Sequence, residues 1–319
     1  MSSIRSIAER VASRPIEICG KAIRIDGRAI RIGRLEADRF EFIDDPEAAL
    51  QEIRQSGVRI DLFSFVQKIR DRQPKYSYPM EWDNLAAVPV STFDHWWTKQ
   101  IDNKTRNMVR RAEKKGVTVR EVVFDDTLVR GISEVYNESP IRQGKPFWHY
   151  QKSLDAVRRA NETFVDRSTF ITASLGDRVI GFAKLVPDED HQQAALMQIL
   201  SMVSHRDKSP TNALIAQAVR SCAERGIPYL VYASFAYDNK LRDSLSDFKQ
   251  HNGFQRIDVP RYYVPLTTRG RIALRLGLHH SITSHIPEPV LTRLRAIRGW
   301  WFARNIRAAN LAEEPSNGA

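Results

Sequence analysis

The sequence has little cysteine and no long apolar run, and both absences narrow the class of protein. Cys19 and Cys222 are the two cysteines among 319 residues, which excludes a disulfide framework and a cysteine-based zinc cluster. No apolar stretch reaches the roughly 20 residues that a membrane-spanning helix needs. The first fifteen residues, MSSIRSIAERVASRP, carry charges throughout and lack an apolar core, so we expect no secretory signal and a cytoplasmic protein.

Histidine is also sparse and scattered. The chain has eight histidines, and His205, His251, His279 and His280 are dispersed or fall on different predicted elements. No motif has the spacing of metal ligands, so we expect no metal cofactor.

The composition that remains is that of a globular protein with an excess of positive charge. Hydrophobic residues make up 42% and charged residues 27% of the chain, which is neither disordered nor fibrous, and the length suffices for two domains. The net charge of +11 favours polyanionic partners such as nucleic acid, phosphorylated substrates or an anionic membrane surface. The charge alone does not choose among them.

The chain is organised around residues 194–235, AALMQILSMVSHRDKSPTNALIAQAVRSCAERGIPYLVYASF. The first ten residues are almost all apolar, as in a strand that is buried on both faces of a sheet. Ser209 and Thr211 are candidate helix caps, and Pro210 suits the first helical position. Apolar residues then recur at helical spacing up to a stop at Gly226, and a second apolar strand follows.

Strand, loop, helix and strand in this order predict a parallel crossover unit. In such units ligands bind beyond the carboxyl ends of the strands, near the helix N-terminus, where free backbone N–H groups can hold a phosphate, a carboxylate or an oxyanion. The same unit also occurs as a plain crossover with an empty helix end. This pattern alone leaves both interpretations open.

The rest of the chain alternates predicted strands and short helices. Residues 16–43 predict a hairpin that turns at Asp26-Gly27, with a third strand at residues 40–43. Gly176-Asp177 predicts a second hairpin, and two final strands are expected on either side of Pro260.

We expect three parts along the chain. They are a smaller N-terminal α/β unit at residues 1–90, a main domain at 91–270 and a basic helical tail at 271–319.

Two stretches carry candidate substrate-binding residues. In the helix that ends at Gly116, Arg106, Arg110 and Lys114 are spaced by four residues opposite the apolar face. That face suits a polyanion or a phosphate, although a charge run is most often only a solvated surface. A polar loop follows the next helix, where Arg with Gln and His suits a phosphate or a sugar, and an ordinary surface loop is the alternative. Its candidates are Tyr136, Asn137, Arg142, Gln143 and His149.

From residue 117 onward the predicted order is strand, two helices, three antiparallel strands, helix, parallel strand, helix and two strands. This order resembles the N-acyltransferase fold of the GNAT superfamily, in which two neighbouring parallel strands splay apart and the acyl donor enters between them. KTRNMVRRAEKKGV at residues 104–117 resembles the helix and turn that precede the acyltransferase unit of the FemABX family. LSDFKQHNGFQRIDVPRYYVPL at residues 245–266 is similar to that family's closing segment. The resemblance implies an α/β (α+β) fold, with a GNAT-type mixed sheet flanked by helices and a smaller N-terminal α/β unit.

The resemblance implies an acyltransferase whose donor is aminoacyl-tRNA, as in FemABX proteins, or acyl-CoA, as in related GNAT enzymes. The glycine-rich pyrophosphate loop of GNAT enzymes is replaced here by HRDKSPTNA at residues 205–213. A loop without glycine weighs against coenzyme A, because the backbone must approach the phosphates closely. Both donors stay open.

The same resemblance implies donor-binding residues. Backbone N–H groups at Leu200, Ser201 and Met202 would polarise the donor carbonyl. The helix start at Ser209, Thr211 and Asn212 would face donor phosphate.

Catalytic candidates follow from the family motif and from the predicted strand and helix ends. Lys249 matches the lysine of the family's FK motif, which implies a place beside donor or acceptor. Glu138 and Asp238 are the carboxylates nearest those ends and are candidate general bases, and Tyr237 could return a proton to the leaving group.

Residues 290–310, VLTRLRAIRGWWFARNIRAAN, predict a basic helix with tryptophan among arginines. Such a helix suits a peripheral contact with the inner membrane face, and packing on the protein's own surface is the alternative. We therefore expect an N-acyltransferase that acts on an amine of a sugar or of a cell-envelope precursor, either small or lipid-linked. The alternative is a non-catalytic module on a GNAT-like frame that binds RNA or lies on a membrane. The sequence does not fix the oligomeric state.

Overall fold

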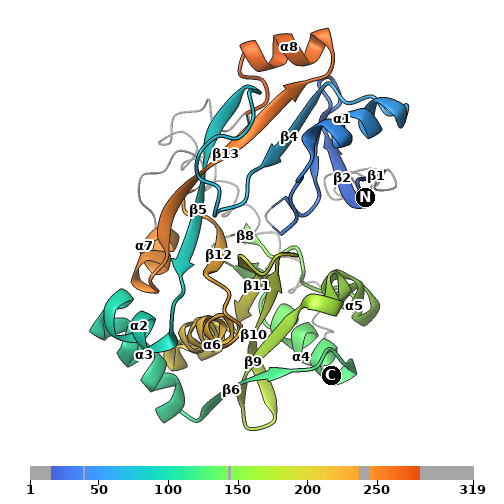
Figure 1. The fold of residues 1–319 in the computed structure, drawn as a ribbon. Coiled ribbons are helices and arrows are strands. Elements are labelled where there is room, and N and C mark those ends of the chain that lie inside the picture. The colour runs from blue at the N-terminus through green and yellow to red at the C-terminus, as the bar shows by residue number, and fades with distance from the viewer. Residues whose placement is uncertain (1–15, 39, 143–144, 237–243, 281–319) are drawn as a thin grey trace, which may run out of the picture.

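The computed structural model of the protein describes residues 16–38, 40–142, 145–236 and 244–280 (Figure 1). Among these residues, eleven strands form one sheet in the order β1-β2-β3-β4-β13-β5-β12-β11-β10-β9-β6. The strands are β1 Ile16–Ile18, β2 Lys21–Asp26, β3 Ile32–Leu35, β4 Leu62–Val66, β5 Met80–Pro89, β6 Val117–Val122, β9 Thr169–Leu175, β10 Arg178–Pro187, β11 Ala194–Ser201, β12 Tyr229–Ser234 and β13 Gln255–Pro265. A small separate pair is formed by β7 Ile141–Arg142 and β8 Lys145–Pro146. The predicted mixed α/β sheet is confirmed.

Helices flank this sheet, and several begin where the sequence places a capping side chain. They are α1 Pro46–Gln55, α2 Phe93–His95, the π-helical turn η2 Trp96–Gln100, α3 Asn103–Lys114, α4 Asp126–Asn137, α5 Leu154–Glu162, η3 Val165–Arg167, η4 Val203–Lys208, α6 Pro210–Glu224, α7 Ser244–His251 and α8 Thr268–Arg275. Asp102 accepts the N–H of Thr105 at 2.7 Å to start α3, and Asp125 accepts that of Leu128 at 2.7 Å to start α4. Each cap satisfies a backbone donor that the first helical turn leaves unpaired. Among the described residues, none of the helices combines the length and the apolar character needed to cross a membrane.

Strands β9, β10 and β11 pair antiparallel in sequence order, and α6 connects β11 to β12, which pairs parallel with it. The hairpin predicted at Gly176-Asp177 joins β9 to β10. Every residue of β10 from Ile180 to Pro187 is buried, because helices α4 and α6 both pack on this strand. The main core lies here, and the apolar side chains of α6 belong to it.

The strands from the first ninety residues extend the same sheet on the other side of β12. Strand β5 lies between β13 and β12, and β13 lies between β4 and β5 (Figure 1). Strands of the predicted unit at residues 1–90 therefore interleave with strands of the following domain in one sheet, and the boundary at residue 90 stays a prediction. The predicted hairpin around Asp26-Gly27 is confirmed by the pairing of β2 with β3. The third strand predicted at residues 40–43 is wrong, since those residues form no strand and β1 takes the place beside β2 instead.

The two final strands predicted around Pro260 are one strand, β13. Pro260 pairs with Trp82 of β5 on one side, while pairing with β4 begins only at the next residue, Arg261. The carbonyl of Pro260 accepts the N–H of Gln67, just past the end of β4. An N–H at residue 260 would point to this same edge of β13, beyond the end of β4. Proline lacks that N–H, so β13 continues through Pro260 without losing a hydrogen bond to β4.

Candidate functional site

The divergence expected between two parallel strands is present between β11 and β12. These strands pair at Ala194 with Leu230 and at Ala195 with Val231, and no further pairing between them occurs among the described residues. Strand β11 nevertheless continues to Ser201, and its last five residues are all partly exposed, whereas Ala194 to Leu196 are buried. We call the side of β11 at residues 196–201 that faces β12 the splayed edge. An interior strand of this sheet therefore has a row of backbone groups that the sheet does not use.

One of the predicted N–H donors points to the splayed edge. The N–H of Met202 donates to the carbonyl of Ile180 at 2.8 Å, so it is used in the ladder with β10. Successive N–H groups of a strand point to opposite edges, which places the N–H of Leu200 toward β10 as well and that of Ser201 toward the splayed edge. The carbonyl of Ser201 lies on this same edge, where it accepts Nη1 of Arg142 at 2.7 Å.

The turn after β11, helix η4, already has an anion bound to its backbone. The carboxylate of Glu138 accepts the N–H of Val203 at 3.0 Å and that of Ser204 at 2.8 Å. Arg142 lies 3.6 Å from the same carboxylate. Burial raises the pKa of Glu138, but these backbone hydrogen bonds and the nearby Arg142 outweigh it and lower the pKa overall. A lowered pKa makes this carboxylate a weaker base than an ordinary glutamate, and its role as general base stays a prediction.

The start of α6 is closed by internal contacts. Ser209 adopts a left-handed conformation with φ of 53° and makes no side-chain cap, so the predicted capping role of Ser209 is wrong. Thr211 Oγ1 lies 2.7 Å from Ser201 Oγ, and Nδ2 of Asn212 donates to Asn252 at 3.0 Å. Pro210 has no N–H to offer. The helix start is thereby tied to β11 and to the residues after α7.

Arg142 and His149, from the predicted polar loop, are mostly buried. The guanidinium of Arg142 donates to the carbonyls of Ser201 and Val135, both at 2.7 Å, so it joins the end of β11 to α4. His149 is 4% exposed and stacks on the ring of Tyr136 with centroids 4.2 Å apart. Burial, followed by the charges of Lys152 and Arg142, lowers the pKa of His149 to about 4, so this imidazole is neutral at pH 7.

Tyr136 connects this buried cluster to the middle of β11. Its hydroxyl donates to Oε1 of Gln198 at 2.7 Å, and burial raises its pKa to about 12. Asn137 is exposed and accepts the N–H of Gln151 at 2.7 Å. Tyr136, Arg142 and His149 therefore hold the second half of β11 in place, with Arg142 bonded at the splayed edge itself. The predicted residues Gln143, Tyr237 and Asp238 lie outside the described residues.

Lys249 lies beside the diverging end of β12. Its side chain is fully buried, its ammonium donates to the carbonyl of Ser234, and it lies 4.9 Å from the ring centroid of Tyr232. Both partners follow Val231, the last residue of β12 that pairs with β11. The predicted place of Lys249 near donor or acceptor stays a prediction, and its position at this strand end is compatible with it.

The predicted basic face of α3 contains two different arginine environments. Arg106 donates to the carbonyls of Trp97 and Ile101 at 2.8 and 2.7 Å, which secures the turn before α3. Arg110 is exposed and lies 5.5 Å from the ring centroid of Trp97, at a cavity of about 380 Å³ between α2, α3 and α6. Arg220 of α6 lies across this cavity, 3.8 Å from the ring centroid of Phe93.

Arg220 was not among the predicted residues. Within the described part of the chain, neither Arg110 nor Arg220 makes a hydrogen bond or an ion pair, so both guanidinium groups can contact an anion. The position of Arg220 along α6 gave no sign of this environment, because its aromatic partner Phe93 belongs to a different helix, α2.

Sequence reasoning also missed Lys184, which is fully buried on β10. Its ammonium donates to the carbonyl of Asn161 at 2.7 Å and to Thr163, at the carboxyl end of α5. Burial lowers the pKa of Lys184 to about 8. A cation here is placed to satisfy the free carbonyls of the helix end.

Two histidines expected to be dispersed are brought together with a carboxylate. Glu81 of β5 and His279 and His280 beyond α8 offer ligand atoms that all lie within 4.8 Å of one another. His279 and His280 are adjacent in sequence, and spacing along the chain could not indicate Glu81, because β5 and the segment after α8 meet only in the folded chain.

Comparison with known proteins finds a matching domain family for part of the chain and similar solved structures for most of it. Residues 103–238 match the family model of the acetyltransferase (GNAT) domain, and no curated protein matches the chain. The crystal structure of FemX is similar, with 10% identity and a TM-score of 0.56 over 82% of this chain and 89% of that one. L-PGS from Bacillus licheniformis is 15% identical, with a TM-score of 0.51 over 81% of this chain and 86% of that one.

A third similar structure is the C-terminal domain of a protein assigned as a lysylphosphatidylglycerol synthetase, from Agrobacterium fabrum. It is 15% identical, with a TM-score of 0.50 over 80% of this chain and 83% of that one. At these identities the likeness shows the shared fold. Together with the family match it confirms the predicted resemblance: residues 103–238 match the GNAT acetyltransferase domain, and the chain has a fold similar to that of FemX.

Proposed function

We propose that the protein transfers an aminoacyl group from tRNA to an amine of a sugar or of a cell-envelope precursor. The main observation behind the proposal is the splayed edge. There β11 and β12 stop pairing, and the N–H of Ser201 faces the space between the two strands. A donor carbonyl bound there would be polarised by this N–H. A preorganised donor of this kind contributes about 10²–10³ in rate when it stabilises the developing oxyanion.

The chemistry is the attack of a neutral amine on the ester carbonyl carbon of the donor. A carbon–nitrogen bond forms, the bond from that carbon to the ribose oxygen breaks, and the proton that the amine loses ends on the ribose oxygen. Positioning and oxyanion stabilisation supply most of the catalysis in such a reaction. The ammonium of Lys249, at the end of β12, is the cation that we propose to offset negative charge on the donor.

Glu138 supports tRNA rather than coenzyme A as the carrier. The turn after β11 is where a GNAT enzyme would hold pyrophosphate, but here the N–H groups of Val203 and Ser204 bind a carboxylate. A pyrophosphate would have to displace this carboxylate or lie against a like charge, and both are unfavourable.

The basic surface supports a polynucleotide donor. Arg110 and Arg220 stack on Trp97 and Phe93 and leave their N–H groups available at one cavity. Arginine on an aromatic face, with a cavity between, suits a phosphate next to an unstacked base. The net charge of +11 acts in the same direction.

The acceptor is proposed from chemistry and from the names of the similar structures. One of these is assigned as a lysylphosphatidylglycerol synthetase, a protein whose product carries an aminoacyl group on a lipid. Phosphatidylglycerol offers hydroxyl groups, so this name supports a lipid-linked acceptor, whereas the amine is proposed from the family resemblance. We propose a lipid-linked or soluble cell-envelope precursor with a free amine, and peripheral membrane contact through residues 290–310, which lie outside the described residues.

The role of the Ser201 N–H can be tested with two substitutions at one position. Ser201→Pro removes the N–H, which is not used in the ladder, and Ser201→Ala removes only the hydroxyl that contacts Thr211. We expect transfer to fall by about 10²–10³ in Ser201→Pro and to stay near that of the parent in Ser201→Ala, with both variants folded by circular dichroism. Equal rates in the two folded variants would exclude this N–H from the reaction.

The donor can be tested by supplying labelled aminoacyl-tRNA or acyl-CoA together with a mixture of amine acceptors. We expect consumption of aminoacyl-tRNA and appearance of the label on an amine by mass spectrometry. Consumption of acyl-CoA alone would refute the donor, and salt-dependent tRNA binding without consumption of any donor would favour the non-catalytic RNA-binding module.

A further inference from the structure

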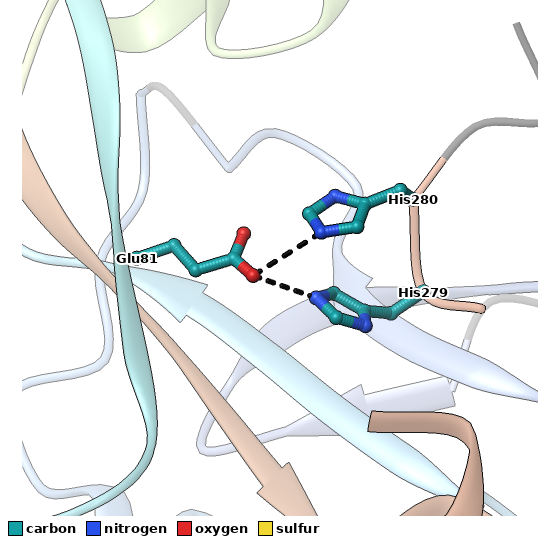
Figure 2. Close-up of side chains that lie close together, drawn as sticks. All are labelled: Glu81, His279 and His280. Atoms are coloured by element: carbon teal, nitrogen blue, oxygen red, sulfur yellow. Dashed lines mark hydrogen bonds and ion pairs between the residues drawn. The ribbon is translucent and has the colours of Figure 1, made fainter. Parts of the chain in front are cut away.

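A cluster of three side chains lies at β5 and the segment after α8, on the other side of β12 from β11. Figure 2 shows Glu81 of β5 facing the imidazoles of His279 and His280, which follow α8. Nε2 of His279 lies 2.9 Å and Nε2 of His280 lies 3.2 Å from the same oxygen, Oε1 of Glu81. Two imidazole nitrogens and one carboxylate oxygen therefore converge on one point.

The turn that ends α8 aims the two histidines back at the sheet. Gly277 has φ of 67°, and the N–H of Leu278 donates to the carbonyl of Ala273 at 2.9 Å. This is the arrangement in which a left-handed glycine closes a helix and reverses the chain. The histidines follow directly, so their position is set by the helix end and not by a long loop.

His279 is held in a fixed orientation. Its side chain is 3% exposed, and its ring lies against Tyr263 of β13 with centroids 4.6 Å apart and against His280 at 4.0 Å. The side chains of Glu81 and His280 are partly exposed to solvent, at 42% and 39% of their surface. The cluster thus has a rigid buried member and an open side that water can reach.

We propose that Glu81, His279 and His280 bind a divalent transition-metal ion, with zinc as the best match. Two imidazoles and one carboxylate are a ligand set that zinc accepts, and water on the open side would complete four-coordination. In a tetrahedral site with bonds of about 2.0–2.2 Å, ligand atoms lie about 3.4 Å apart. The observed separations of 2.9 and 3.2 Å from Glu81 need only small side-chain movements to reach that spacing.

The position of the site indicates a structural role. Glu81 pairs with Arg261 in the register of β5 and β13, whereas β5 meets β12 from Leu85 to Pro89. Strand β12 lies between β5 and β11, the strand of the splayed edge, so the ion would not lie on that edge. It would fasten the chain beyond α8 to β5.

The affinity is expected to be moderate. Nδ1 of His279 is buried and has no hydrogen-bond partner among the described residues, so an acceptor that would fix the tautomer of a metal-bound imidazole is missing there. Loss of such a contact weakens metal affinity by about 10–100-fold. We therefore expect weaker binding than at a zinc site whose imidazoles are both hydrogen-bonded.

The experiment uses the full chain without a histidine tag, after dialysis against a chelator. Zn²⁺ is titrated by calorimetry, and Co²⁺ is added separately to record its visible ligand-field absorption, which reports nitrogen and oxygen ligation. We compare the parent with Glu81→Gln and His280→Ala, and with His251→Ala as the matched control at an exposed histidine outside the cluster. Circular dichroism checks that each variant is folded.

We expect one bound ion per chain, a raised thermal midpoint with Zn²⁺ and at least about ten-fold weaker binding in both cluster variants. His251→Ala should bind as the parent does. Because His280 is partly exposed, His280→Ala tests the site even if Glu81→Gln does not fold. Parent-like affinity in a folded His280→Ala or Glu81→Gln variant, or the absence of cobalt absorption in the parent, would overturn the proposal.

Discussion

His149 makes the stability of the cluster behind the splayed edge depend on pH. Its pKa is lowered from 6.5 to about 4, chiefly by burial, while in the unfolded chain it returns to its ordinary value. Between these two values the unfolded chain binds the additional proton, so the free energy of unfolding falls as the pH drops through this window. Above pH 6.5 the imidazole is neutral in both states and contributes no pH dependence.

The magnitude follows from the pKa difference. At about 1.4 kcal/mol per pKa unit, the full effect is about 3 kcal/mol, and about 2 kcal/mol of it is lost by pH 5. His149→Phe keeps a ring against Tyr136 and cannot take up the proton. This variant should therefore lose about 2 kcal/mol less stability than the parent between pH 7 and pH 5.

Urea unfolding followed by circular dichroism at both pH values measures this difference. His95→Phe, a substitution at an exposed histidine, should keep the pH dependence of the parent. The same loss of stability in His149→Phe and in the parent would refute the reasoning, as would an NMR titration in which the His149 ring takes up its proton above pH 6.

Three further predictions concern other parts of the molecule. Because burial lowers the pKa of Lys184 to about 8, the free energy of unfolding should rise by about 2 kcal/mol from pH 8 to pH 10; denaturant titrations should show no such rise in Lys184→Met. Gly270→Ala would place a methyl group 1.8 Å from the carbonyl oxygen of Asp61, so its unfolding free energy should fall by about 3 kcal/mol, and a parent-like melting temperature would contradict this. Arg110→Ala and Arg220→Ala should each weaken tRNA binding and reduce its salt dependence in filter-binding titrations, whereas unchanged affinity in both would remove this cavity from the donor site.

Sequence patterns predicted the crossover unit well. Pro210 begins α6 as expected, the helix ends just before Gly226, and both flanking strands lie where the apolar runs are. The hairpin at Gly176-Asp177 was predicted equally well. These features are local, since a cap, a turn residue and an apolar period each act within a few positions of the chain.

The contacts that define the site could not be predicted in the same way. Glu138 meets the turn after β11 across 65 and 66 positions of sequence, and Glu81 meets His279 across 198. The strand order that puts β5 beside β12 is likewise a property of the folded sheet. The sequence indicates Glu138 as a candidate because of its carboxylate. It does not show that this carboxylate accepts the N–H groups of Val203 and Ser204, because those contacts depend on where β11 ends in the fold.

The placement of β13 has a consequence for how the chain is made. Strands β4 and β5 leave the ribosome early, yet the strand that fills the space between them begins at Gln255. Until then the nascent chain carries two open strand edges, and such edges readily pair with other chains. Synthesis that halts before this point should yield a fragment that needs chaperones to stay in solution.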